Sequence, residues 1–159
     1  MDANIMEKHK IFETQRAPGF LFDALSKAYS VRTNKVIKPF NLTATEWPVL
    51  DQIYLHKGIN QKELAQYCLK DPSTIVKTLD HLEKKGLIVR QPDEKDRRAF
   101  KIIITEKGIS CRQEAYQATR ELFEKVTETL SQNDIDQLYD ICIRIFIALQ
   151  ELDQQKNPH

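Results

Sequence analysis

The sequence predicts a mainly α-helical protein with one small β-hairpin. Apolar residues recur at the three- and four-residue spacing of helices along most of the chain. Two segments differ, LIVRQ (87–91) and AFKIIIT (99–105), because they are rich in residues that favour strands and the second alternates with a period of two. Residues 92–98 between them include three acids and three bases, so we expect a hairpin with a long, charged tip.

Length and composition are those of one globular domain with long helical extensions: 159 residues, 41% hydrophobic and 30% charged. No apolar run reaches the roughly 18 residues of a transmembrane helix. The N-terminal residues also lack the apolar centre of a signal peptide. We therefore expect a cytoplasmic protein with no membrane partner.

Residues that carry catalytic or metal chemistry are few and scattered. The cysteines Cys68, Cys111 and Cys142 are far apart, and no histidine has another ligand four residues away. The chain also lacks the motifs of serine hydrolases, zinc proteases and phosphate-binding loops. These observations argue against an enzyme, and they predict no metal and no cofactor.

The first helix is expected to follow Pro18-Gly19 and to end at Pro39. Its apolar stripe at helical spacing consists of Leu21, Ala24, Ala28 and Val31.

The second helix carries a capping-box pattern from Thr43 to Glu46, and Gly58 closes it. If Thr43 were the cap, Pro48 would remove one early helical hydrogen bond, whereas a start at Thr45 avoids this loss. Both starts are compatible with the pattern.

Two further helices are separated by a brief turn. Asn60 can cap a short helix over residues 61–68. Asp71 can cap the next one, because Pro72 then falls at the first helical position, where its missing N–H costs nothing. Gly86 ends this helix, and its buried stripe is expected to be Ile75, Leu79 and Leu82.

After Gly108 the pattern indicates two long helices. The first contains Ala115, Leu122, Val126 and Leu130, and the second starts near Ser131, capped there or at Asn133. Residues 141–152, ICIRIFIALQEL, are apolar on most of the helix circumference, which is typical of a helix buried on several sides. One small domain offers too little cover, so we predict a homodimer interface built from both termini, with an intramolecular bundle as the alternative.

The middle of the chain is its basic part. Residues 57–108 carry twelve Lys/Arg and eight Asp/Glu, a balance of +4, against +1 for residues 1–56 and −4 for residues 109–159. This basic part contains the order short helix, tight turn, helix, hairpin, which is a winged helix-turn-helix. We therefore predict a DNA-binding domain over residues 41–108, flanked by N-terminal (1–40) and C-terminal (109–159) dimerisation helices.

The helix that follows Asp71 is the candidate recognition helix. An α-helix fits the major groove, and the side chains near its N-terminus reach the base edges. The outward residues are expected to be Ser73, Thr74, Val76, Lys77 and His81, and Arg90 belongs to the same basic region. The alternative for each of them is an ordinary solvated surface.

The charged tip of the hairpin is the candidate wing. Arg97 and Arg98 can reach the minor groove, where negative potential attracts arginine. Asp96 would be repelled by DNA, so we expect it to pair with an arginine and fix its pose. The alternative is a charged tip that only protects a β-edge.

Residues 71–108, DPSTIVKTLDHLEKKGLIVRQPDEKDRRAFKIIITEKG, resemble the core of the MarR (multiple antibiotic resistance regulator) family. The resemblance implies a homodimeric transcription regulator, usually a repressor, that binds a pseudo-palindromic operator in double-stranded DNA. Asp96 and Arg98 match the D-x-R wing motif, and Ser73, Thr74 and Lys77 match DNA-contacting positions. Val76 and Lys77 stand where a small polar residue and arginine are common, so the operator sequence stays open.

The resemblance also implies release from DNA by a small aromatic or anionic effector, bound between the dimer helices and the DNA-binding lobe. Arg16, Phe22, Tyr29 and Trp47 are the candidates to line such a cleft, although the interpretation of Trp47 as a core residue is favoured. The alternative to a DNA-binding regulator is a helical dimeric protein-interaction module without direct DNA readout.

Overall fold

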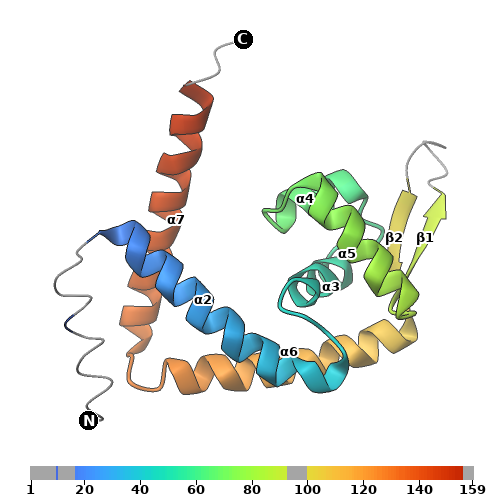
Figure 1. Ribbon diagram of the computed structural model, residues 1–159, viewed down its shortest axis with the longest axis horizontal. Coiled ribbons are helices and arrows are strands. Elements are labelled where there is room, and N and C mark those ends of the chain that lie inside the picture. Colours follow the sequence, from blue (N-terminus) through green and yellow to red (C-terminus); the bar gives the residue numbers. More distant parts are fainter. Residues whose placement is uncertain (1–9, 11–16, 93–99, 156–159) are drawn as a thin grey trace. The chain divides into compact units, whose positions relative to one another are not determined.

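The computed structural model describes residue 10, residues 17–92 and residues 100–155 (Figure 1). The chain divides into two compact units, Met1–Leu122 and Phe123–His159. The described elements are α2 (Pro18–Ile37), a 3-10 helix η1 (Lys38–Phe40), α3 (Glu46–Leu55), α4 (Gln61–Tyr67), α5 (Pro72–Lys84), β1 (Ile88–Pro92), β2 (Phe100–Ile104), α6 (Glu106–Val126) and α7 (Gln132–Gln155). The predicted mainly α class with one small hairpin is confirmed.

Helix α2 begins at Pro18, and the chain leaves it through η1, which contains Pro39. Only Thr33 and Ile37 are buried on α2 among the described residues. The apolar residues Leu21 and Val31 of the predicted stripe are about half exposed. The helix is therefore confirmed, but its apolar stripe stays exposed among the residues that the structure describes.

Helix α3 begins at Glu46, near the later of the two predicted starts, and Thr45 before it makes no capping bond with its side chain. Thr43 and Glu46 still exchange the two bonds of a capping box: the Thr43 amide donates to Glu46 Oε2 at 2.8 Å, and the Glu46 amide donates to Thr43 Oγ1 at 3.2 Å. Pro48 is the third residue of the helix. The Trp47 amide donates to the Thr43 carbonyl at 2.9 Å, so the next bond of this ladder falls at Pro48, which has no N–H to donate. The proline therefore costs one early helical hydrogen bond, as expected if Thr43 acts as the cap.

Helices α4 and α5 have the predicted caps. Asn60 and Glu63 form a complete capping box at the start of α4. Asp71 accepts a hydrogen bond from the Thr74 amide at 2.8 Å, and Pro72 is the first residue of α5. Gly86 follows the end of α5 with φ +71°, a conformation that favours glycine. Local sequence signals therefore define this helix pair.

Strands β1 and β2 pair antiparallel, with Val89 opposite Ile103. Their bounds differ from the predicted ones, 87–91 and 99–105, by one residue at each end. The hairpin is also joined to the segment before α4, because the Ile102 amide donates to the Ile59 carbonyl at 2.9 Å and Asn60 bridges to Lys101. This junction fixes the base of the wing to the helix-turn-helix.

Helix α6 begins at Glu106, two residues before Gly108, whereas the predicted start lay after Gly108. Thr105 starts it, since its carbonyl accepts from the Ile109 amide at 2.8 Å and its hydroxyl accepts from the Gly108 amide at 3.0 Å. A Cβ on Gly108 would clash with the Leu87 carbonyl oxygen. Gly108 is therefore a close-packing residue inside the helix rather than a break before it.

The predicted extent of α6 was too long at its other end, because Leu130 lies beyond Val126 in the connection to α7. Helix α7 is capped by Ser131 and not by Asn133: Ser131 Oγ accepts from the Asp134 amide at 3.2 Å, and Asp134 Oδ2 accepts from the Ser131 amide at 2.8 Å. No residue of α7 whose side chain is described is buried.

A single apolar core lies under the helix-turn-helix and the hairpin. It includes the predicted stripe of α5, and all its buried members fall between residues 37 and 115. The buried members are Ile37, Leu42, Val49, Leu50, Ile53, Ile59, Leu64, Ala65, Ile75, Leu79, Leu82, Leu87, Ile88, Ile102 and Ala115.

Arg112 attaches α6 to α3. Its Nε donates to Asp51 Oδ1 at 2.8 Å, and its guanidinium lies 4.4 Å from the ring centroid of Tyr54 and 4.5 Å from that of Tyr116. An ion pair combined with two cation–π contacts holds a planar cation in one orientation.

Candidate nucleic-acid interface

Helix α5 has one face in the core and one face in solvent. Ile75, Thr78, Leu79 and Leu82 are buried, and the predicted contact residues lie on the opposite side. Ser73, Val76, Lys77 and His81 are exposed, and Thr74 is half-buried. The structure thus brings these five predicted residues together along one side of one helix.

Asp71 organises the N-terminal end of this face. Its Oδ1 accepts from the Ser73 hydroxyl at 2.6 Å, and its Oδ2 accepts from the Thr74 hydroxyl at 2.6 Å. Together with the Thr74 amide, these hydroxyls lower the pKa of Asp71, the Ser73 hydroxyl being the largest cause. The sequence indicated Asp71 as a cap, but it did not indicate that both hydroxyls are held by it.

The C-terminal end of α5 is held by an ion pair. Lys85 Nζ donates to both carboxylate oxygens of Glu46, at 2.7 and 2.8 Å, and to the Asn41 carbonyl at 2.7 Å. Burial on its own would raise the pKa of Glu46, but the hydrogen bonds from Lys85 and Thr43 lower it. Lys85 is one of the twelve Lys/Arg residues of the basic part of the chain, and its charge is compensated by this buried carboxylate.

His81 lies near the same carboxylate. Its Nδ1 is 3.8 Å from Glu46 Oε1, and its side chain is 68% exposed. The imidazole is therefore accessible from solvent while one of its nitrogens lies beside a negative charge.

Arg90 connects strand β1 to helix α5. Its guanidinium donates to Asp80 Oδ1 at 2.6 Å and to Glu83 Oε2 at 2.7 Å, and its amide donates to Glu83 Oε1 at 3.1 Å. Both carboxylates belong to α5, three residues apart on its surface. The side chain predicted to contact DNA is thus engaged within the protein.

The three wing-tip residues Asp96, Arg97 and Arg98 lie outside the described residues. The strands that carry the tip are described, and they present Val89 and Phe100 as exposed apolar side chains.

The predicted effector residues do not share one environment. Trp47 is half-buried and packs against the core, as its alternative interpretation required. Phe22 and Tyr29 are exposed on α2, and Arg16 lies outside the described residues.

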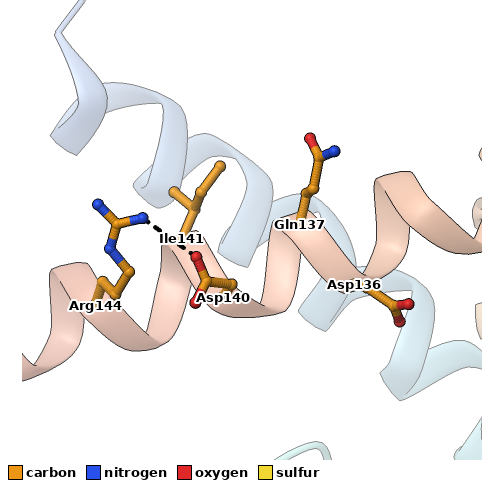
Figure 2. Close-up of a pocket in the computed structure, with 5 residues that line it drawn as sticks. All are labelled: Asp136, Gln137, Asp140, Ile141 and Arg144. Carbon is orange, nitrogen blue, oxygen red and sulfur yellow. Dashed lines mark hydrogen bonds and ion pairs between the residues drawn. The ribbon is translucent and has the colours of Figure 1, made fainter.

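A shallow hollow of about 460 Å³ lies along α7, away from the predicted effector residues in the sequence (Figure 2). Asp136, Gln137, Asp140, Ile141 and Arg144 line it, and none of them was predicted as a site residue. Arg144 donates to Asp140 at 3.2 Å, as the dashed line in Figure 2 shows. All five side chains are exposed, so the hollow is an open surface feature of one helix.

Within the described ranges, no group of three or more His, Cys, Asp and Glu side chains is placed to hold a metal ion. In the same part of the chain, no helix has the length and apolar character needed to cross a membrane. Burial raises the pKa values of the Cys68 and Cys111 thiols, which disfavours the reactive thiolate at neutral pH.

Comparison with known proteins gives one consistent result. The MarR family model matches residues 42–100, which extend from the segment before α3 to the start of β2. A MarR-family transcriptional regulator from Rhodococcus sp. RHA1 is 30% identical, with a TM-score of 0.73 over 80% of this chain and 90% of that chain.

Two further solved structures are similar. The transcriptional repressor CouR bound to a 23-mer DNA duplex is 25% identical, with a TM-score of 0.78 over 84% of this chain and 94% of that chain. CouR from Rhodococcus jostii RHA1 bound to p-coumaroyl-CoA is 28% identical, with a TM-score of 0.73 over 81% of this chain and 91% of that chain.

Proposed function

The chain belongs to the MarR family and is a DNA-binding transcription regulator rather than an enzyme. From this premise we propose that it is a homodimeric repressor that binds a pseudo-palindromic operator. The exposed face of α5 is the single observation that carries the proposal. This face lies in the segment that the family model matches, and its helix is fixed at both ends, by Asp71 and by Lys85. Such a helix can enter the major groove without reorganising.

In this proposal, α5 reads the bases. Ser73 and Thr74 lie at its N-terminal end, Val76 can pack on a thymine methyl, and Lys77 can reach guanine or a phosphate. Lysine cannot form the bidentate hydrogen bonds to guanine that arginine forms, so Lys77 contributes more to affinity than to sequence specificity.

The wing supplies the second contact. We assign Arg98 to the minor groove, with Arg97 beside it and Asp96 fixing its pose. Arg90 was predicted to contact DNA, but we propose a structural role for it. Because Asp80 and Glu83 engage its guanidinium, it holds β1 against α5 instead of touching DNA. His81 is a peripheral contact at the far end of the same helix face.

Dimerisation is supported by large apolar side chains that are exposed on the described helices of one chain. On α7, Leu138, Ile141, Leu149 and Leu152 are each roughly half exposed, as are Leu21, Leu25 and Val31 on α2. A monomeric soluble protein rarely exposes so many large apolar residues on its helices. Two copies could bury them against each other and present two recognition helices to one operator.

Release by a small aromatic or anionic effector completes the proposal. The similar CouR was solved with p-coumaroyl-CoA, a ligand that is both aromatic and anionic. Arg16, Phe22, Tyr29 and Trp47 remain the candidates to contact an effector in this chain. We place the protein in the cytoplasm, where it can reach its operator.

Fluorescence anisotropy tests this function. A labelled duplex from the region upstream of the gene is compared with a scrambled duplex at physiological salt. We expect tight binding to the upstream duplex alone, and Arg98→Ala should weaken it by about 1–3 kcal/mol. Lys125→Ala is the matched control, because Lys125 is an exposed cation at the end of α6.

Equal and weak binding to both duplexes would contradict the proposal and favour a protein-interaction module. Unchanged affinity of Arg98→Ala would remove the wing assignment alone. The salt dependence adds an independent measurement, because each phosphate contact steepens the loss of affinity with salt concentration.

A further inference from the structure

Three hydrogen bonds converge on the carboxylate of Asp71, and two of them come from the hydroxyls that face the proposed DNA site. The Ser73 hydroxyl lies 2.6 Å from Oδ1, the Thr74 hydroxyl lies 2.6 Å from Oδ2, and the Thr74 amide lies 2.8 Å from Oδ1. Both carboxylate oxygens are therefore occupied, each by a different side chain.

The chemistry of these groups fixes the direction of each bond. An ionised carboxylate accepts hydrogen bonds and cannot donate them, and these same bonds lower the pKa of Asp71, so it is ionised at neutral pH. Each hydroxyl has a single hydrogen, and here that hydrogen is directed at Asp71. The oxygens of Ser73 and Thr74 can then only accept a further hydrogen bond.

The major groove offers few partners to such an oxygen. Phosphate oxygens, guanine N7 and O6, adenine N7 and thymine O4 are all acceptors, so they cannot pair with it. Only the amino groups of adenine and cytosine donate. The charge of Asp71 also disfavours an approach of phosphates to this end of the helix.

We propose that Asp71 is a positioning residue for base recognition: by holding the hydroxyl hydrogens of Ser73 and Thr74, it makes these two residues read the amino groups of adenine or cytosine. This inference rests on the proposed function, because it assumes that α5 lies in the major groove. It restricts the bases that Ser73 and Thr74 contact in the operator to those with an amino group in the major groove, adenine and cytosine.

The test uses Asp71→Asn in the full-length protein. Asparagine caps helices as well as aspartate does, so α5 keeps its cap. Its amide group has one acceptor oxygen and a donor NH₂, which turns at least one hydroxyl hydrogen outward. Asp134→Asn is the matched control, because Asp134 accepts the same kinds of bond from Ser131 at the start of α7.

Wild type and both variants are bound to a pool of operator duplexes in which each position is randomised, and the bound DNA is sequenced. For Asp71→Asn we expect the preference for adenine or cytosine over guanine or thymine to fall by at least about fivefold at one or two positions of the bound DNA. This is the size of the effect of a mismatch at a single position. Asp134→Asn should retain the wild-type profile. An Asp71→Asn profile equal to that of wild type would overturn the inference and leave Asp71 a cap alone.

Ser73→Ala and Thr74→Val give a second measurement that does not depend on the cap. Each should erase the preference for adenine or cytosine at one position and leave the other positions unchanged. A uniform loss of affinity with an unaltered profile would overturn the inference. If wild type itself selects no sequence from the pool, the proposed function fails, and this inference fails with it.

Discussion

The ammonium of Lys85 contacts both carboxylate oxygens of Glu46, which lies 39 residues earlier in the chain. The pair joins the C-terminal end of α5 to the first residue of α3. Only 4% of the Glu46 side chain and 22% of the Lys85 side chain are exposed, so solvent screens this pair far less than a surface pair. The position of α5 therefore depends on a polar contact as well as on its apolar stripe.

Lys85→Met should lower the free energy of unfolding by about 1–3 kcal/mol, because the buried carboxylate of Glu46 loses both hydrogen bonds from Lys85 and keeps the bond from the Thr43 amide, with His81 Nδ1 at 3.8 Å. Urea denaturation monitored by circular dichroism measures this loss. Lys27→Met is the control, since Lys27 and Asp23 form an exposed pair on α2 that should matter by less than about 0.5 kcal/mol. Equal losses in the two variants would contradict the special role of the Glu46 pair.

The same pair predicts a dependence on pH. The folded-state pKa of Glu46 lies below its ordinary value of 4.5, so its stabilising effect is complete above that value and is lost as the pH falls through the folded pKa. In Lys85→Met the largest lowering influence is gone and burial raises this pKa. The stability difference between wild type and the variant should be largest near neutral pH and shrink below pH 4.5. A difference that stays constant from neutral to acid pH would show that the carboxylate charge is not involved.

Gly108→Ala should destabilise the protein by about 2 kcal/mol or more, because the new Cβ would clash with the Leu87 carbonyl oxygen and lie 2.7 Å from Ile104 Cγ1. The gain in helix propensity, about 1 kcal/mol, is too small to offset this. Gly19→Ala in α2 is the matched control, because a Cβ added at Gly19 would have nothing within 4 Å and the change should be neutral or stabilising. A thermal melt of each variant distinguishes the two cases, and an unchanged melting temperature for Gly108→Ala would refute the packing role.

Arg90→Met should lower the free energy of unfolding by about 1 kcal/mol, since two half-exposed carboxylates of α5 lose their common partner. It should also weaken operator binding, because the hairpin is no longer held to α5. Arg90→Lys keeps the positive charge but cannot donate hydrogen bonds to Asp80 and Glu83 with the geometry of a guanidinium. We therefore expect an intermediate loss of both stability and operator affinity. If Arg90→Met lost affinity for DNA while Arg90→Lys kept it fully, a direct phosphate contact would explain Arg90 better than a positioning role.

Much of the fold was decided by signals that act over a few residues. Asn60 and Glu63, Asp71 and Pro72, and Ser131 fix helix starts because a cap and its partner are at most three residues apart. The same holds for the outward face of α5, which follows from helical periodicity. These features could be predicted from the sequence, with Asn133 left as an alternative to Ser131, and the structure confirms them.

Other features depend on partners that are distant in the chain, and only the tertiary structure decided them. Gly108 looked like a helix break until α6 was seen to pass the Leu87 carbonyl. Arg90 looked like a free cation until β1 was placed beside Asp80 and Glu83. The sequence does not show which distant residue a charged side chain or a glycine contacts. The free energy of such a contact depends on the distance and the solvent exposure, and packing sets both. The sequence by itself determined the elements and the face that they present, whereas packing determined which charges on that face remain available to DNA.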